Sequence, residues 1–236
     1  MAIRTYLAMT GEEIAGYSEM PENAAWMVCP FSDDWEEVPW QLQDHPFLVL
    51  TDGVQPESAA FEDLISKICA LEPRQVLLDF QQKKGREVDA FAESLRRSLQ
   101  CPVIASHNYA DGKNGPVFLP PVPLHARLCD HIASWKDREI WLDISAEGEQ
   151  IILTETGAAV KPLSHIVPEG IVHQEKNLHC HYTISLQEDS AVFALWRTQE
   201  DLEDLLQEAE TLGIQNAIGL YQEWQGSSRM PFRGEC

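Results

Sequence analysis

The sequence predicts an α/β fold, namely an irregular TIM-type (β/α) barrel with an antiparallel β insertion. Its 236 residues are close to the roughly 250 residues of a typical barrel of this kind. Strand-like and helix-like stretches alternate through the middle of the chain. The strand-like stretches are short, continuous apolar runs, which is typical of parallel strands buried on both faces. The alternative that this pattern allows is an open doubly wound α/β sheet with a small β subdomain.

Five apolar runs in the first half of the chain predict strands. They contain stretches such as Val76-Leu77-Leu78, without a strict alternation of polar and apolar residues. The predicted strands are Thr5–Met9, Ala25–Phe31, Pro46–Thr51, Gln75–Phe80 and Pro102–Ser106.

Three stretches with apolar residues at helical spacing predict helices after the later strands. The first helix spans about Pro56 to Leu71, because Pro56 suits a first helical turn and Pro73 cannot continue a helix. The second and third helices span about Glu87–Leu99 and Leu124–Trp135.

A βαβ unit is predicted near the end of the chain, with strands at Ala191–Trp196 and Ile214–Tyr221. Thr198 is placed as the N-cap of the helix between them, with Asp201 three residues later in the position that completes a capping box. Gly213 is placed to end the helix. The apolar stripe of this helix consists of Leu202, Leu205, Leu206, Ala209 and Leu212.

Two regions interrupt the alternation of strands and helices. Residues 32–45 are polar without a helical period and predict a long loop where a barrel helix would be expected. Residues 139–190 predict mainly a β meander, with strands at Glu139–Ile144, Gln150–Thr154 and Leu178–Leu186. We therefore expect a single barrel-like domain over residues 1–236, with a β-rich insertion at about 139–190 and short or missing helices in the first third.

The chain is strongly acidic, with 17 Lys and Arg against 38 Asp and Glu and a net charge of −21. Nucleic acids and anionic membranes are bound mainly through cations, so neither is expected as a partner. The N-terminal apolar run is too short for a secretory signal, and the six cysteines show no CxxC spacing, so a cytoplasmic location is expected. Since the sequence contains no glycine-rich phosphate loop, no cofactor is expected.

Polar and aromatic residues gather where the predicted strands end. In (β/α) barrels the functional residues lie at the carboxyl ends of the strands, so these residues predict a pocket for a sugar or a similar polar ring. Aromatic faces would serve as platforms and amides as hydrogen-bonding partners. The candidates are Asp52, Asp79, Gln81, His107, Asn108, Tyr109, Trp196, Arg197, Tyr221, Gln222, Glu223 and Trp224.

The segment VLLDFQ, which ends at Gln81, resembles the fourth strand of the chitinase-like glycoside hydrolases of family eighteen. In that family the strand carries the pattern D-x-D-x-E, whose last Asp orients the N-acetyl group of the substrate and whose Glu protonates the leaving oxygen. Asp79 matches the last Asp, Phe80 matches the aromatic position, Gln81 stands in place of the Glu, and Leu77 stands in place of the first Asp. The last predicted strand, followed by Trp224, resembles the family's last strand with its Trp platform. The resemblance covers a few short pieces of the chain.

The resemblance implies a barrel that binds a carbohydrate or a similar polar ligand and is non-catalytic or weakly hydrolytic. A carboxamide has no proton to give at neutral pH, so Gln81 cannot act as a general acid. Asp79 would orient the ligand, while Glu223 and Asp52 are the carboxylates whose positions suit a replacement acid. The walls of the cleft would be Tyr109, Trp196, Tyr221 and Trp224.

A second hypothesis is a metal-dependent enzyme. His179 and His181 would point to the same face of a strand, with His173 and Glu175 close in sequence. Two imidazoles and a carboxylate can bind zinc or iron. The other interpretation is that both histidines lie on the outer face of the meander, while Cys180 faces inward. A third hypothesis is a structural or partner-binding protein without a small-molecule site.

Overall fold

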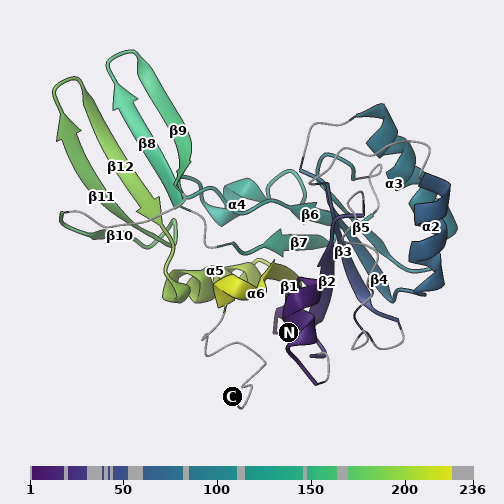
Figure 1. Ribbon diagram of the computed structural model, residues 1–236. Helices are drawn as coiled ribbons and strands as arrows, with labels where there is room; N and C mark the ends of the chain where they lie inside the picture. The colour runs from purple at the N-terminus through teal and green to yellow at the C-terminus, as the bar shows by residue number, and fades with distance from the viewer. Residues whose placement is uncertain are drawn as a thin grey trace.

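The computed structural model contains a closed barrel of eight parallel strands and a separate five-stranded antiparallel sheet (Figure 1). This architecture confirms the predicted TIM-type barrel with an antiparallel insertion and excludes the open doubly wound sheet. The residues that the structure describes are 2–18, 21–30, 39, 42, 45–52, 61–81, 85–110, 115–145, 148–163 and 170–224.

The barrel strands follow the order β1-β13-β7-β6-β5-β4-β3-β2, and β1 pairs with both β2 and β13 to close the ring. All five strands predicted in the first half of the chain are confirmed, with somewhat different bounds. The strands are β1 (Arg4–Met9), β2 (Ala24–Val28), β3 (Phe47–Thr51), β4 (Gln75–Asp79), β5 (Val103–Ser106), β6 (Val117–Leu119), β7 (Ile140–Asp143) and β13 (Asn216–Leu220).

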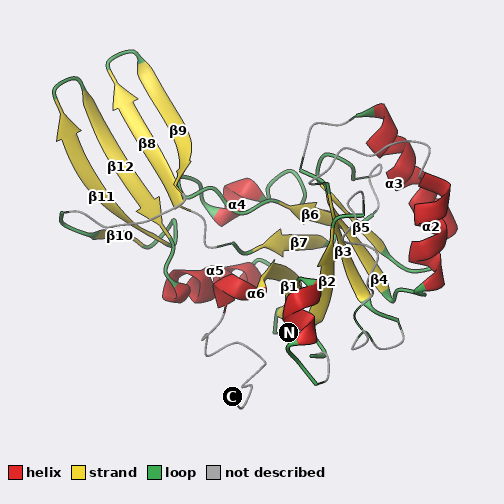
Figure 2. Cartoon of the chain, viewed as in Figure 1, coloured by secondary structure: helices red, strands yellow, loops and turns green. Residues whose placement is uncertain are grey.

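The helices are unequal in length, as expected for an irregular barrel. They are α1 (Gly11–Ala15), α2 (Phe61–Ala70), α3 (Arg86–Ser98), α4 (Leu128–His131), α5 (Gln199–Thr211) and α6 (Tyr221–Trp224). The long helices α2 and α3 lie on the same side of the barrel (Figure 2). Of the helix predicted at 124–135, only α4 is helical, because turns occupy most of that stretch. Within the described ranges, no helix is both long and apolar enough to cross a membrane.

Part of the sequence-based prediction lies outside the described residues. This applies to most of the predicted loop at 32–45 and to the predicted helix start at Pro56.

The barrel interior is a packed core in its amino-terminal half. Side chains that point inward form one buried cluster, which includes Leu77, Ile104 and Ile218. Tyr6, Phe47 and Trp141 form an aromatic triangle within this core, with ring centroids 5.2 to 5.6 Å apart. Because these large rings fill the amino-terminal half, the hollow part of the interior lies toward the carboxyl ends of the strands.

The inserted sheet consists of five antiparallel strands in the order β10-β11-β12-β8-β9 and projects away from the barrel (Figure 1). Its strands are β8 (Gly148–Thr154), β9 (Gly157–Leu163), β10 (His173–Glu175), β11 (Cys180–Gln187) and β12 (Ser190–Trp196).

The predicted βαβ unit is wrong in its first strand. The strand before α5 is β12, which belongs to the inserted sheet, whereas the barrel neighbours of β13 are β1 and β7. Periodicity indicates that a strand exists but not which sheet it joins. The apolar sequence of β12 therefore looked like a barrel strand, and β7 looked like the start of the meander.

The predicted capping of α5 is confirmed. The backbone N–H of Asp201 donates to the Thr198 hydroxyl at 3.3 Å, and the Thr198 backbone N–H donates to the Asp201 carboxylate at 2.8 Å. Gly213 follows the helix with φ of +87°, a left-handed conformation that favours glycine. Leu212 is 42% exposed, so it lies outside the buried stripe of the helix.

Candidate functional site

A small pocket of about 130 Å³ opens at the carboxyl ends of the barrel strands. It is lined by side chains two residues beyond the packed interior layer. On β4, Leu77 is followed by Asp79, and Gln81 comes two residues after the strand ends; on β7, Trp141 is followed by Asp143, and Ser145 comes two residues after the strand ends. Because residues two apart point to the same side, these four polar residues face the same pocket as the apolar residues that precede them.

Asp79 and Gln81 form the polar wall on the β4 side. The Gln81 side-chain amide donates to Asp79 Oδ1 at 3.0 Å, and its backbone N–H donates to Asp52 Oδ1 at 3.2 Å. Burial raises the pKa of Asp79, the hydrogen bond from Gln81 opposes this rise, and the nearby Asp52 carboxylate adds to it. Asp79 is therefore a carboxyl group that holds its proton to a higher pH than an exposed aspartate.

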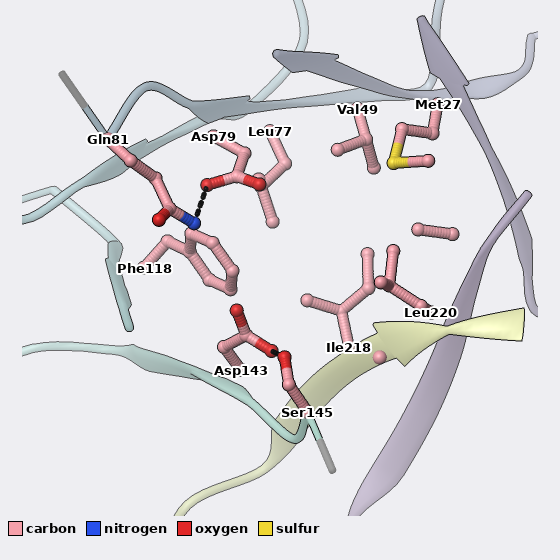
Figure 3. A pocket seen from close by; sticks show the side chains of 12 residues that line it. Met27, Val49, Leu77, Asp79, Gln81, Phe118, Asp143, Ser145, Ile218 and Leu220 are labelled. Atoms are coloured by element: carbon pink, nitrogen blue, oxygen red, sulfur yellow. Dashed lines mark hydrogen bonds between the residues drawn. The ribbon is translucent and has the colours of Figure 1, made fainter. Parts of the chain in front are cut away.

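Asp143 and Ser145 form the polar wall on the β7 side. The Ser145 hydroxyl donates to Asp143 Oδ1 at 2.6 Å. Figure 3 shows this pair and the Asp79–Gln81 pair at different sides of the pocket, with Phe118 between them. Sequence reasoning missed Asp143 because its strand was placed in the meander, although Ile140–Asp143 has the same apolar-to-Asp ending as Gln75–Asp79.

The floor of the pocket is apolar. It is made by Met27, Val49, Leu77, Phe118 and Ile218, which come from five different barrel strands. The volume is below the roughly 300–1,000 Å³ of sites for drug-sized ligands. The pocket is therefore suited to one small ring or to a substituent of a larger ligand. Its polar side chains offer oxygen atoms that accept hydrogen bonds, and its floor offers apolar contacts.

Three of the predicted site residues meet here: Asp79 and Gln81 line the pocket, and Asp52 is buried directly behind Gln81. The exposed carboxylate of Glu223 lies on α6 and does not line the pocket, although its catalytic role was predicted. His107 and Asn108 follow β5 but do not line it either.

The predicted aromatic walls are not walls of this pocket. Tyr109 is buried against Phe80, with ring centroids 5.7 Å apart. The Tyr221 hydroxyl hydrogen-bonds to the Tyr17 hydroxyl at 2.6 Å.

The two tryptophans are also displaced from the pocket. Trp196 and the adjoining Arg197 lie at the end of the inserted sheet, where Trp196 stacks on His181. Trp224 is buried, and its indole N–H donates to the Ile144 carbonyl at 3.3 Å. A Cβ at Gly219 would lie 2.6 Å from that indole nitrogen, so the indole ring fits in this position because residue 219 is a glycine. Sequence spacing placed these aromatic residues near strand ends but could not show which way they point.

The histidines of the metal hypothesis pair with helix α5. His181 Nδ1 lies 2.7 Å from Asp201 Oδ2, and His179 Nε2 lies 2.5 Å from Glu208 Oε2. His179 precedes β11 and has φ of +48°, so the strand alternation assumed for it does not apply. Among the described residues, no group of three or more His, Cys, Asp or Glu is arranged so that it could hold a metal ion.

No protein-family model and no curated protein matches the sequence significantly. Solved structures with a similar fold include glycoside hydrolase-like barrels at low sequence identity. One is the spore cortex-lytic enzyme SleL of Bacillus megaterium, with 10% identity and a TM-score of 0.44 over 76% of this chain; the match spans 58% of the SleL chain.

The matches to two further solved structures extend over most of the length of those chains. The putative sporulation-specific glycosylase ydhD of Bacillus subtilis has 12% identity and a TM-score of 0.49, over 82% of this chain and 87% of that one. A chitinase of Chromobacterium violaceum has 10% identity and a TM-score of 0.49, over 93% of both chains.

Proposed function

We propose that this protein binds a sugar ring, or a polar ring of similar size, at the carboxyl end of its barrel without hydrolysing it. The observation that carries the proposal is that Asp79 and Asp143 line one pocket with an apolar floor. Sugar hydroxyls are donors that carboxylates accept, and the C–H faces of a sugar ring pack on apolar and aromatic side chains such as Phe118. The pocket offers both kinds of contact in one small space.

Gln81 is the reason for proposing binding rather than hydrolysis. A glycosidase needs a group that donates a proton to the leaving oxygen, and a carboxamide cannot do so. In this proposal Gln81 holds the Asp79 carboxylate in place through their 3.0 Å hydrogen bond. Asp79 then accepts hydrogen bonds from the ligand.

Weak hydrolysis is the second candidate, and the raised pKa of Asp79 favours it. A carboxyl group that holds its proton to a higher pH is a better acid near neutrality. Asp143, rather than the predicted Glu223, would then be the second carboxylate, because Asp143 lines the pocket.

Isothermal titration calorimetry with N-acetylglucosamine oligomers and with neutral gluco-oligosaccharides tests the binding proposal. We expect millimolar to micromolar affinity for at least one series. Asp79→Asn should weaken that affinity by about 10- to 100-fold, because hydrogen bonds to a charged group contribute about 1.5–3 kcal/mol. Glu223→Gln is the matched control and should leave it unchanged. No heat with either series, or equal losses in the two variants, would overturn the proposal.

The Gln81→Glu variant separates binding from hydrolysis. If the site is a binding site built on a hydrolase-like frame, this change restores a protonatable group beside Asp79 and hydrolysis of the bound oligosaccharide should rise above the wild-type rate. Hydrolysis by the wild-type protein that disappears in Asp143→Asn would instead establish the second candidate.

A further inference from the structure

The pocket at the carboxyl end of the barrel is rich in hydrogen-bond acceptors and poor in donors. Its polar side chains are two carboxyl groups, Asp79 and Asp143, together with one amide, Gln81, and one hydroxyl, Ser145. No lysine, arginine or histidine lies among the described residues that line it. A ligand that supplies hydrogen-bond donors and positive charge therefore matches this lining better than one that supplies acceptors.

Both side-chain donors of the pocket already serve its carboxyl groups. The Gln81 amide donates to Asp79 Oδ1 at 3.0 Å, and the Ser145 hydroxyl donates to Asp143 Oδ1 at 2.6 Å. The hydroxyl has a single proton and therefore none left for a ligand, whereas the Gln81 amide has one N–H left. An acceptor group on a ligand, such as a carbonyl oxygen, would find at most one side-chain donor among these residues.

The second carboxyl oxygen of Asp79 has no hydrogen-bonding partner within the described chain. Figure 3 shows it at the edge of the pocket, on the side of the carboxyl group that faces away from Gln81. Burial and the nearby Asp52 both disfavour the charged form of Asp79 and raise its pKa. A partly buried polar atom without a partner is costly, and a ligand that pairs with it removes that cost.

We propose that the ligand is an amino sugar whose amine is free and protonated, rather than a neutral or N-acetylated sugar. This preference, which rests on the proposed sugar-binding function, concerns the same pocket. An ammonium group carries three N–H donors and one positive charge, and its hydrogen bonds to carboxylates are stronger than those between neutral groups. An acetyl group on the same nitrogen removes the charge and leaves a single N–H donor beside a carbonyl acceptor.

Two further features of the molecule favour a cation at this position. Phe118 lies between the Asp79–Gln81 pair and the Asp143–Ser145 pair (Figure 3), and the face of an aromatic ring attracts a nearby cation. The whole chain has a net charge of −21, so its field attracts cations toward the molecule and repels anions. A sugar that carries a carboxylate would be repelled by the same charges.

Three β-1,4-linked trimers test this preference, because they differ only in the group on the second carbon of each ring. That group is an amine in the glucosamine trimer, an acetamide in the N-acetylglucosamine trimer and a hydroxyl in the glucose trimer. Isothermal titration calorimetry at about pH 6.5, where the amine is protonated, measures the three affinities. We expect the glucosamine trimer to bind about tenfold or more tightly than the other two, because only its amine pairs with the carboxylates.

The Asp143→Asn variant keeps the size of the side chain and removes its charge. It should reduce the preference for glucosamine over glucose by about threefold or more, and Asp79→Asn should do the same. Glu223→Gln is the matched control, because Glu223 is an exposed carboxylate on α6 that does not line the pocket, and it should leave the preference unchanged. Circular dichroism establishes that each variant is folded, and the glucose trimer shows whether its pocket still binds a sugar.

Different results bear on the amine preference and on sugar binding itself. Equal affinities for the three trimers, or tighter binding of a neutral trimer, would overturn the amine preference and leave sugar binding in place. Binding of none of the trimers would overturn both. A preference for glucosamine that persists undiminished in Asp79→Asn and Asp143→Asn, or falls equally in Glu223→Gln, would also overturn it. The net charge of the chain, rather than the pocket, would then be the source of the preference.

Discussion

The barrel and the inserted sheet are both made of short apolar strands, but they bury these strands differently. In the barrel, one side of each strand faces the packed interior and the other side faces the helices, so residues such as Leu77 and Leu78 are both buried. In the inserted sheet, Ile184 and Leu186 lie on a face that the described chain leaves open. The closed barrel therefore supplies stability and rigid strand ends for the pocket, while the sheet supplies a surface.

The largest expected effect contrasts one side chain from each region. Phe47→Ala removes a fully buried ring from the aromatic triangle inside the barrel and should lower the free energy of unfolding by about 3–5 kcal/mol. Leu186→Ala should change it by less than about 0.5 kcal/mol, because Leu186 is solvent-exposed in the single chain. Urea denaturation measures both changes in the free energy of unfolding. Comparable losses would show that the sheet is part of the folding core.

The next effect concerns the junction of the two regions. The buried Arg197 guanidinium donates to the carbonyls of Val122 at 2.7 Å, His179 at 3.1 Å and Leu178 at 3.3 Å. Arg197→Met leaves these buried acceptors without their donor and should cost about 2–4 kcal/mol.

Hydrogen exchange locates this loss. Amide exchange in Arg197→Met should accelerate in β11 and in residues 121–126, with little change in β3 and β4. Equal acceleration everywhere would mean that Arg197 supports the whole molecule rather than the junction.

The same contrast explains which features of the structure can be predicted from the sequence. Continuous apolar runs predicted β1 to β5 and β13, because a strand buried on both faces has few polar interruptions, but the three-residue β6 was not predicted as a strand. The Thr198 capping box follows from local chemistry alone. The assignment of β7 and β12 to their sheets needs pairing partners far away in the chain, which no local period records. For the same reason Asp79 and Gln81 line the pocket as expected from their strand end, whereas Asp143 was missed and Trp224, expected as a wall of the cleft, is buried on α6 against Ile144.

A smaller effect concerns Asp201, which caps α5 and contacts His181 of the sheet. Burial opposes its ionisation, but hydrogen bonds from the Thr198 N–H, the Thr198 hydroxyl and His181 lower the pKa of Asp201 below its usual range. Asp201→Ala should cost about 1–2 kcal/mol at neutral pH.

The pH dependence of this cost has a definite sign. A carboxyl group with a lowered folded-state pKa stabilises the fold above its unfolded pKa and loses that contribution as the pH falls through the folded pKa. The difference in unfolding free energy between wild type and Asp201→Ala should therefore shrink in acid. A difference that is constant with pH would assign the loss to packing rather than to the ionised carboxylate.

The smallest effect concerns Asp79 in the pocket, and its sign is opposite. Burial, together with the neighbouring Asp52, raises the pKa of Asp79, so its ionised form is more costly in the folded than in the unfolded chain. Its contribution is favourable below the unfolded pKa and is lost as the pH rises through the folded pKa. Asp79→Asn should therefore raise the melting temperature at pH 7, because the neutral amide carries no buried charge. The rise should be smaller at pH 4. Scanning calorimetry at both pH values measures it, with Glu223→Gln as the exposed control.

A lower melting temperature in Asp79→Asn at pH 7 would mean that Asp79 is a structural group of the barrel end. A gain in stability joined to a loss of ligand affinity would mark Asp79 as a residue retained for binding at the expense of stability.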